Sequence, residues 1–327
     1  MYNYMASLLR AKLIVPEAVT NGAGSQLIPL FLNMEGCASQ EEMNANVKAT
    51  IKRGYDPLTA YLGSEKGKVC LVGSGPSISE THEELSGDII AINSSIKYLL
   101  EHDIVPKYGM IWDADEICEN FAVAHPDITY LLGARCHSKV FDKLADCKTI
   151  VWHAGGDHNI SEFLLKHKID EPMVNGGSAG VTRGMYLAVA LGYTDLKIFG
   201  ADSSYSDAGD THITGSLVYE KDFRCWIGNG DTAKEFRTTP EWCAQVNEFR
   251  DIYSVFRHPA YQIDIEVMGP GMLPYMAYLM EQKDKQNLLW HEDGTPHKSN
   301  VMMDITKPPT DKPQPLAEEP ENVNVSL

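Results

Sequence analysis

The sequence lacks several features that mark well-known classes of protein. No apolar run approaches the roughly eighteen residues that a membrane helix needs, so we expect no membrane span. No lysine- or arginine-rich run is present, and 28 basic against 45 acidic residues give a net charge of −17, which disfavours nucleic-acid binding. The 7 cysteines form no C-x-x-C pair, which argues against a zinc ribbon and favours a reducing compartment. With no secretory signal visible, we expect a cytoplasmic protein.

What is present is the composition of a folded domain. The 327 residues are 43% hydrophobic and 22% charged, which suits one large α/β domain with attachments or two modest domains. Short apolar runs recur at Val69–Val72, Ile89–Ile92, Tyr108–Trp112, Thr129–Leu132, Thr149–Trp152 and Leu196–Phe199. Strands that are apolar at nearly every position, alternating with helices, predict a Rossmann-like, doubly wound, mostly parallel sheet.

Changes in composition and hydrophobic pattern divide the chain into four parts. Residues 1–66 read as an N-terminal helical segment, with Ser39 and Glu42 spaced as a capping box. Residues 67–215 form the expected nucleotide-binding core. Residues 216–283 lose the alternation and read as a C-terminal helical cap, which includes the helix-compatible stretch Trp242–Phe256. Residues 284–327 read as a linker and a flexible, proline-rich acidic tail.

Two glycine-bearing turns are candidates for binding a nucleotide phosphate. One follows the first strand of the core, and the other opens a helix that ends at Gly192. In open α/β sheets ligands gather beyond the carboxyl ends of strands, and glycine lets backbone amides approach a phosphate. The alternative is that the small residues serve only tight turns and close packing. The candidate binding residues are Gly73, Ser74, Gly75, Pro76, Ser77, Asn93, Gly176, Gly177, Ser178 and Gly180.

A pair of carboxylates follows another predicted strand. Asp113 and Asp115 can supply hard oxygen ligands to Mg²⁺ held against a diphosphate. The spacing does not force the two side chains together, and helix capping is an equally good reason for aspartate here.

Titratable residues after two further strands are candidates for proton transfer. His153 follows one strand, while Asp202, Tyr205 and His212 follow the next. A carboxylate, a phenol and an imidazole at one sheet edge can polarise or deprotonate an acceptor hydroxyl, with His212 the best candidate base. A solvated histidine and a loop pinned by hydrogen bonds are the alternatives.

Taken in order, these motifs resemble those of the DUF115 family, over roughly residues 66–275. The matching segments are Gly73–Ser77, Asp113–Asp115, His153–Asp157, Gly176–Ser178 and Gly200–His212. That family includes the 6-hydroxymethylpterin diphosphokinase (MptE-like) proteins and the core of the flagellin motility accessory factors. The sequence is also distantly similar to bacterial sialyltransferases that use CMP-sialic acid.

The two branches of the resemblance imply different reactions. The diphosphokinase branch implies ATP with Mg²⁺, but Gly155 replaces a histidine of its His-Ala-His-Gly-Asp pattern. The motility-factor branch implies transfer of a nonulosonic acid from a CMP donor, and it matches the Gly-Gly-Ser helix start and the segment through His212 better. We therefore predict a nucleotide-dependent transferase, a glycosyltransferase rather than a diphosphokinase, acting on a small-molecule or glycan acceptor. A non-catalytic accessory protein that retains the fold is the third hypothesis, and the oligomeric state is left open.

Overall fold

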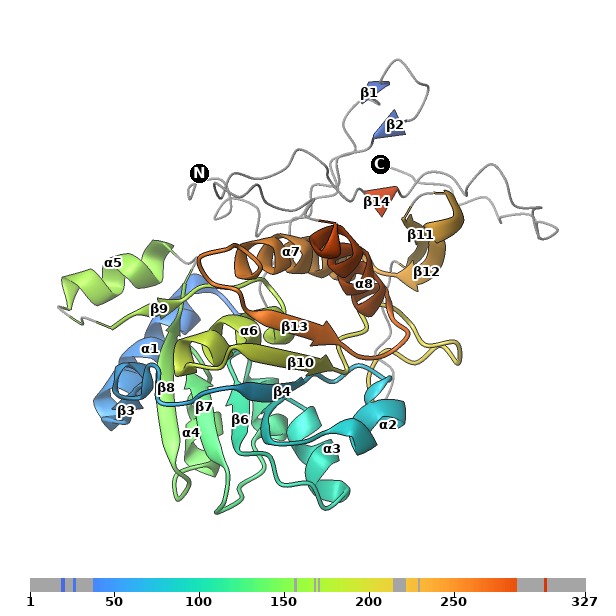
Figure 1. The fold of residues 1–327 in the computed structure, drawn as a ribbon. Helices are drawn as coiled ribbons and strands as arrows, with labels where there is room; N and C mark the ends of the chain where they lie inside the picture. Colours follow the sequence, from blue (N-terminus) through green and yellow to red (C-terminus); the bar gives the residue numbers. More distant parts are fainter. Residues whose placement is uncertain are drawn as a thin grey trace, which may run out of the picture.

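The computed structural model describes residues 38–155, 158–167, 169, 171–213, 222–228 and 230–286, and the short pieces 19–20, 26–27 and 303–304. Its centre is a nine-stranded sheet (Figure 1) in which β9 pairs with β8 and the other strands follow the order β13-β10-β4-β5-β6-β7-β8-β3. Every pairing in this sheet is parallel, which confirms the predicted doubly wound α/β fold. The strands are β3 (Asp56–Pro57), β4 (Lys68–Val72), β5 (Asp88–Ile92), β6 (Tyr108–Ile111), β7 (Thr129–Gly133), β8 (Thr149–Ala154), β9 (Met173–Val174), β10 (Asp195–Phe199) and β13 (Asp264–Val267).

The strands are apolar at nearly every position because both faces of the sheet are covered. In β4, Val69 and Leu71 join the core on one face, while Cys70 and Val72 join the core on the other. This follows from the two-residue period of a strand, which sends neighbouring side chains to opposite faces. Each face is then buried by its own layer of helices.

Two helical layers provide that cover. One holds α1 (Gln40–Arg53), α2 (Ile78–Thr81), α3 (Ser95–Glu101), α4 (Ser138–Lys143) and α5 (His158–Lys166). The other holds α6 (Gly180–Leu191), α7 (Pro240–Phe256) and α8 (Met272–Lys285). Figure 1 shows α7 and α8 above the sheet and α3 and α4 below it. Short helical turns complete the set: η2 (Leu58–Tyr61), η3 (His82–Glu84), η4 (Glu116–Phe121) and η5 (Gly230–Thr232).

Helix α1 lies within the predicted N-terminal helical segment, whose residues 1–37 lie outside the described residues apart from 19–20 and 26–27. Its capping box is formed as expected: the Ser39 side chain accepts from the Glu42 N–H, and the Glu42 side chain accepts from the Ser39 N–H at 2.7 Å. The sequence did not predict that β3 follows and pairs with β8, so this segment contributes a strand to the main sheet. β1 (Val19–Thr20) and β2 (Gln26–Leu27) form a separate antiparallel pair.

The region predicted as a helical cap also contains strands. Helix α7 agrees with the predicted stretch, but β11 (Phe223–Ile227) and β12 (Lys234–Thr238) form an antiparallel hairpin, which β14 (Met303–Asp304) extends. β13 then returns to the main sheet beside β10. The cap is therefore partly helical and partly built into the sheet. Nearly all of the predicted tail, 287–327, lies outside the described residues.

The order of the strands identifies where a ligand would bind. From β4 the chain builds outward through β5, β6, β7 and β8, then returns to place β10 on the opposite side of β4. Such a reversal leaves a crevice beyond the carboxyl ends of the two strands where the order changes. The Gly73–Ser77 turn leaves β4 at this point, and the Gly200–Asp202 turn leaves β10 beside it.

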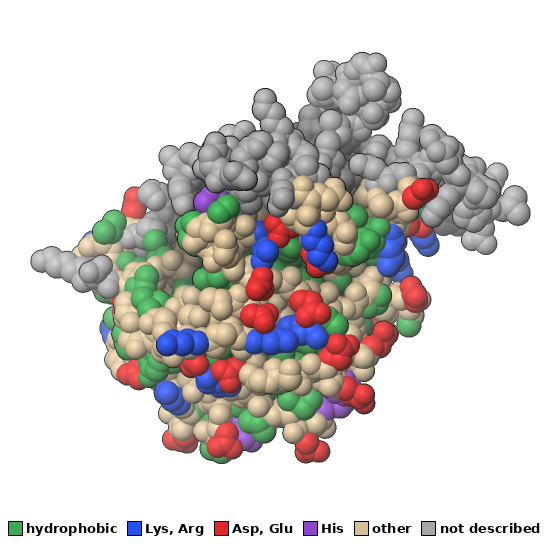
Figure 2. Space-filling model, in the orientation of Figure 1, with side chains coloured by type: hydrophobic (Ala, Val, Ile, Leu, Met, Phe, Trp, Pro, Cys, Tyr) green, Lys and Arg blue, Asp and Glu red, His purple; other side chains and the backbone are tan. Residues whose placement is uncertain are grey.

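The surface agrees with the composition. Figure 2 shows acidic and basic side chains intermixed on the face drawn, without an extended basic area. Lys107, Lys197 and Arg257 each pair with two carboxylates. Among the helices that the structure describes, none combines the length and apolarity needed to cross a membrane.

Candidate functional site

The turn after β4 is held tightly against the end of β10. The N–H groups of Gly73 and Gly75 donate to the carbonyls of Phe199 and Gly200, both at 2.8 Å. A Cβ on Gly73 would lie 2.4 Å from the Gly200 carbonyl oxygen, so no larger residue fits. Close packing therefore explains these glycines, and their two amides are engaged within the protein. The N–H of Ser74 makes no hydrogen bond to the described residues.

Asp202 holds the other half of the same turn. Its Oδ2 accepts from the Ser77 N–H at 3.0 Å, while its Oδ1 and the Ser77 hydroxyl are buried without partners. Burial raises the pKa of Asp202. The turn before α8 covers this carboxylate, since a Cβ on Gly271 would lie 2.7 Å from Asp202 Cβ. Asp202 thus lies at the predicted edge of the sheet, in contact with the turn rather than open to an acceptor.

The end of β5 and the start of α6 meet this turn. Asn93 follows β5 with a φ of 55°, a left-handed conformation that asparagine tolerates better than most residues, and its Oδ1 is buried without a partner. A Cβ on Gly180 would lie 3.9 Å from Asn93 Nδ2, and a Cβ on Gly73 would lie 2.8 Å from Val181 Cγ2. The two predicted glycine turns therefore converge around Asn93, as expected from the sequence.

The α6 start already contains an anionic group from the protein. Glu248 of α7 accepts from the N–H of Ser178 at 2.8 Å and from its hydroxyl at 3.0 Å. Gly177 is required here, since its Cβ would lie 2.3 Å from Glu248 Oε2. Burial raises the pKa of Glu248, although its hydrogen bonds with Ser178 act in the opposite direction. Sequence reasoning missed Glu248 because no local pattern links it to a turn seventy residues earlier.

His212 and Tyr205 both lie near Trp242, and the segment that carries His212 contacts the Gly73–Ser77 turn. The N–H of Ile213 donates to the Ser74 carbonyl at 2.9 Å, which brings His212 beside the turn. The rings of His212 and Tyr205 lie 6.5 Å and 5.3 Å from Trp242 between centroids. Burial lowers the pKa of His212, so its imidazole is neutral near pH 7 and able to accept a proton. The structure thus brings His212, Tyr205 and Asp202 to one edge of the sheet.

The predicted metal ligands are engaged elsewhere. Asp113 lies 3.4 Å from Arg135 in an ion pair, and Asp115 caps η4 by accepting from the Ile117 N–H at 2.9 Å. In the described ranges no group of three or more histidine, cysteine or acidic side chains is arranged to hold a metal ion. For Asp115, the capping role that the sequence left open is the one observed. Asp113 and Asp115 thus each have a partner within the protein, and their role as metal ligands stays a prediction.

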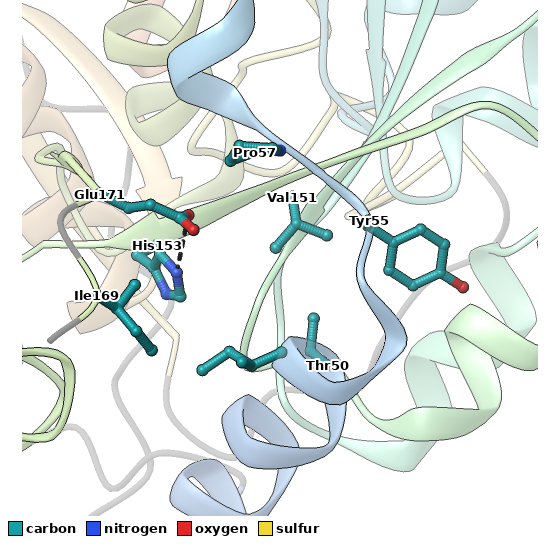
Figure 3. Close-up of a pocket in the computed structure, with 8 residues that line it drawn as sticks. Thr50, Tyr55, Pro57, Val151, His153, Ile169 and Glu171 are labelled. Atoms are coloured by element: carbon teal, nitrogen blue, oxygen red, sulfur yellow. Dashed lines mark ion pairs between the residues drawn. The ribbon is translucent and has the colours of Figure 1, made fainter. Parts of the chain in front are cut away.

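His153 is separate from the other candidate catalytic residues. It lies on β8, and β5, β6 and β7 stand between that strand and β4, a span of about 19 Å at the usual strand spacing. Its side chain, 2% exposed, lines a cavity of about 90 Å³ together with Thr50, Tyr55 and Glu171 (Figure 3). Its Nε2 lies 3.2 Å from Glu171 Oε2, while Nδ1 has no partner within the described part of the chain. The adjacent Gly156 and Asp157, predicted with it, lie outside the described residues.

Two arginines near these turns were not among the candidate residues predicted from the sequence. Arg183 lies in the first turn of α6, and Arg135 follows β7. Both guanidinium groups lie against the indole of Trp112, at the end of β6. The available signal for Arg135 was a charged residue two positions after the end of β7.

Comparison with known proteins agrees with this architecture. The profile of the family described as 6-hydroxymethylpterin diphosphokinase MptE-like matches residues 41–208. The chain belongs to this family. The match runs from α1 to just beyond β10, so it contains both glycine turns but ends before His212 and Glu248. Among curated proteins, no match was found.

Solved structures with some similarity include two glycosyltransferases. The structure of MAf glycosyltransferase from Magnetospirillum magneticum AMB-1 has a TM-score of 0.49 and 17% identity, covering 75% of this chain. The present chain spans 42% of that protein's length. The sialyltransferase CstII from Campylobacter jejuni, solved with cytidine-5'-monophosphate, has a TM-score of 0.27 and 15% identity, covering 74% of this chain and 94% of its own.

Proposed function

We propose that this protein is a nucleotide-dependent transferase, and that its donor is a CMP-activated sugar of the nonulosonic acid type. The observation that carries the proposal is the convergence of the Gly73–Ser77 turn, Asn93 and the α6 start at the point where the strand order reverses. Parallel sheets bind ligands at that place. The motif order that resembles the motility accessory factors supports the sugar donor.

Buried polar atoms support a ligand at this place. Asn93 Oδ1 is buried without a hydrogen-bond partner among the described residues, a costly arrangement that a bound polar molecule would relieve. The buried Ser77 hydroxyl lies beside the carboxylate of Asp202. The Ser74 N–H is a further donor without a partner in the described residues. Together these groups can bind a nucleotide that carries both hydroxyl groups and a phosphate.

His212 is the better candidate for the base that activates the acceptor. Its lowered pKa keeps the imidazole neutral, whereas Asp202 already accepts a hydrogen bond from Ser77 and is covered by Gly271. In the proposed reaction His212 removes a proton from the acceptor hydroxyl as the CMP leaving group departs. Tyr205, whose ring packs on Trp242, would help to position the acceptor.

The alternative is a Mg-ATP-dependent diphosphokinase activity; the family's description names a 6-hydroxymethylpterin diphosphokinase. The family assignment favours this alternative. The contacts of Asp113 with Arg135 and of Asp115 with the η4 backbone argue against it, because they engage the carboxylates that would bind Mg²⁺. A CMP donor has a single phosphate and makes less demand on a metal ion.

Thermal-shift measurements with CMP, CDP, ATP and GTP, each with and without Mg²⁺, test the proposal. Stabilisation by CMP without a metal supports the sugar-transfer activity, whereas stabilisation only by ATP with Mg²⁺ would contradict it. In a CMP-sugar hydrolysis and transfer assay, we expect His212→Ala to lower transfer by about 10²-fold or more, the usual contribution of a general base. Full turnover by His212→Ala would refute the role of this residue.

A further inference from the structure

The indole of Trp112, at the end of β6, contacts two arginine side chains. The guanidinium carbon of Arg135 lies 4.2 Å from the ring centroid, and that of Arg183 lies 4.9 Å from it. Trp112 is itself packed on Trp152, with centroids 6.5 Å apart and the rings inclined by 23°. Two cations are therefore held on one rigid aromatic group at the carboxyl edge of the sheet.

Arg183 has no carboxylate partner among the described residues. Only 6% of the residue is exposed, and its Nη1 donates to the carbonyls of Gly155 at 3.0 Å and Val174 at 2.8 Å. Its Nε is buried and has no hydrogen-bond partner among the residues that the structure describes. Burial, reinforced by the charge of Arg135, lowers the pKa of Arg183 to about 10, whereas the charge of Glu248 acts in the opposite direction. A buried cation without a direct counter-charge is unfavourable, so the site favours an anion from outside.

Arg135 adds charge that the protein does not fully balance. Its Nε donates to the Trp112 carbonyl at 3.1 Å, and its Nη2 lies 3.4 Å from Asp113, whose side chain is 42% exposed. No hydrogen bond from its Nη1 to the described residues is observed. Among the described residues, Asp113 is thus the one carboxylate within ion-pair distance of either guanidinium group, and it pairs with Arg135 alone. Glu248 acts on Arg183 only through its charge, without an ion pair.

The arginine pair adjoins the proposed nucleotide site. A Cβ on Gly180 would lie 3.8 Å from Trp112 Nε1 and 3.9 Å from Asn93 Nδ2, which places Trp112 beside the α6 start. An anion held by the arginines would therefore be a second negative group of the same ligand. We propose that Arg135 and Arg183 form a subsite that binds the carboxylate of the donor's sugar acid, an inference that rests on the proposed function. The planar guanidinium fork suits a carboxylate because it can offer two parallel N–H donors.

Calorimetric titration of the full chain with CMP and with CMP-N-acetylneuraminate tests this subsite. Arg135→Gln is the main variant because the Arg135 side chain is 18% exposed, and Arg224→Gln is a matched control at a 70% exposed position. We expect Arg135→Gln to weaken CMP-N-acetylneuraminate binding by about tenfold, the usual effect of losing a charged hydrogen bond, and to change CMP binding less than about threefold. Equal weakening of both ligands, or of neither, would overturn the subsite.

Thermal shifts with free N-acetylneuraminate and with pyrophosphate separate this inference from the donor assignment. If no CMP compound binds but N-acetylneuraminate stabilises the wild-type protein and not Arg135→Gln, the carboxylate subsite stands while the CMP donor does not. If only pyrophosphate or ATP with Mg²⁺ depends on Arg135, the carboxylate assignment is overturned. Stabilisation by none of these anions would overturn it as well. Arg183→Lys, which keeps the buried charge, provides a second variant and is expected to show the same selective loss.

Discussion

Acidification is expected to destabilise the protein through His153. Burial lowers the pKa of this histidine to about 4, against 6.5 for a free imidazole. Between these two values the unfolded chain binds a proton that the folded chain excludes, so the free energy of unfolding falls as the pH falls. For this difference in pKa, the loss between pH 7 and pH 5 is about 2 kcal/mol.

The neighbouring carboxylate opposes part of this effect. Glu171 lies 3.2 Å from His153, and burial raises its pKa above the usual 4.5. A carboxyl group with a raised folded pKa contributes most stability below its unfolded pKa, and it loses that contribution as the pH rises through the folded value. On acidification, the protonation of Glu171 therefore restores part of the stability that is lost through His153. Replacing Glu171 by Gln removes this gain, so the loss on acidification becomes larger.

The assay is urea unfolding followed by fluorescence, at closely spaced pH values from 7 to 5. The wild-type protein is compared with Glu171→Gln and with His153→Gln, in which no titrating group remains at position 153. We expect the pH dependence to be steepest in Glu171→Gln and shallowest in His153→Gln. If the wild-type protein and His153→Gln lose stability in parallel over this range, the reasoning about the buried imidazole is wrong.

Two further predictions concern the carboxylates that hold the glycine turns, both measured by the same urea unfolding at pH 7. Glu248→Ala leaves the Ser178 N–H without its acceptor and should cost about 1–3 kcal/mol, whereas Glu248→Gln keeps an acceptor and relieves a buried charge, so its loss should be smaller. The raised pKa of Glu248 also predicts a pH dependence. As the pH falls through this pKa, the free energy of unfolding of the wild-type protein should rise relative to that of Glu248→Gln. A relative rise at higher pH would contradict this prediction. Asp202→Ala leaves the buried Ser77 N–H unpaired and should lower the free energy of unfolding by about 1–3 kcal/mol. Asp202→Asn keeps an acceptor and should lower it less. Equal losses in the two variants would show that this hydrogen bond contributes little to stability.

Much of the core could be predicted because its signals are local. The apolar runs after Lys68 correspond to buried strands, and the capping box at Ser39 begins a helix as its pattern indicates. The Gly73–Ser77 turn directly follows a predicted strand, and the second glycine turn was predicted as the start of a helix, which α6 confirms. The strand before that second turn, β9, was not predicted. The alternation of side chains along β8 also held a signal: Val151 and His153 are two residues apart and share a face, and both line the cavity of Figure 3.

What could not be predicted depends on contacts between distant segments. β13 pairs with β10 although the two strands are separated by the hairpin and α7, and neither the length nor the pattern of Asp264–Val267 marks it as part of the main sheet. The partnership of Glu248 with Ser178 likewise requires α7 to lie on α6. For Asp113 and Asp115 the sequence left metal binding and helix capping open. It does not reveal that Asp113 pairs with Arg135 or that Asp115 accepts from the backbone at the start of η4.

These contacts also indicate which part of a nucleotide each group would bind. The protein satisfies the amides of Gly73, Gly75 and Ser77 by itself, so the turn is stable without a ligand and its glycines reflect packing. Asn93 Oδ1, buried without a partner, is an acceptor and pairs with a hydroxyl or amino group rather than with a phosphate. We therefore expect the ribose or base of the nucleotide to lie against Asn93. Its phosphate is expected nearer the Ser74 N–H, because Glu248 already accepts from the Ser178 N–H at the α6 start. On this arrangement Asn93→Asp, which keeps an acceptor at the same place, would bind nucleotide better than Asn93→Ala despite its added negative charge.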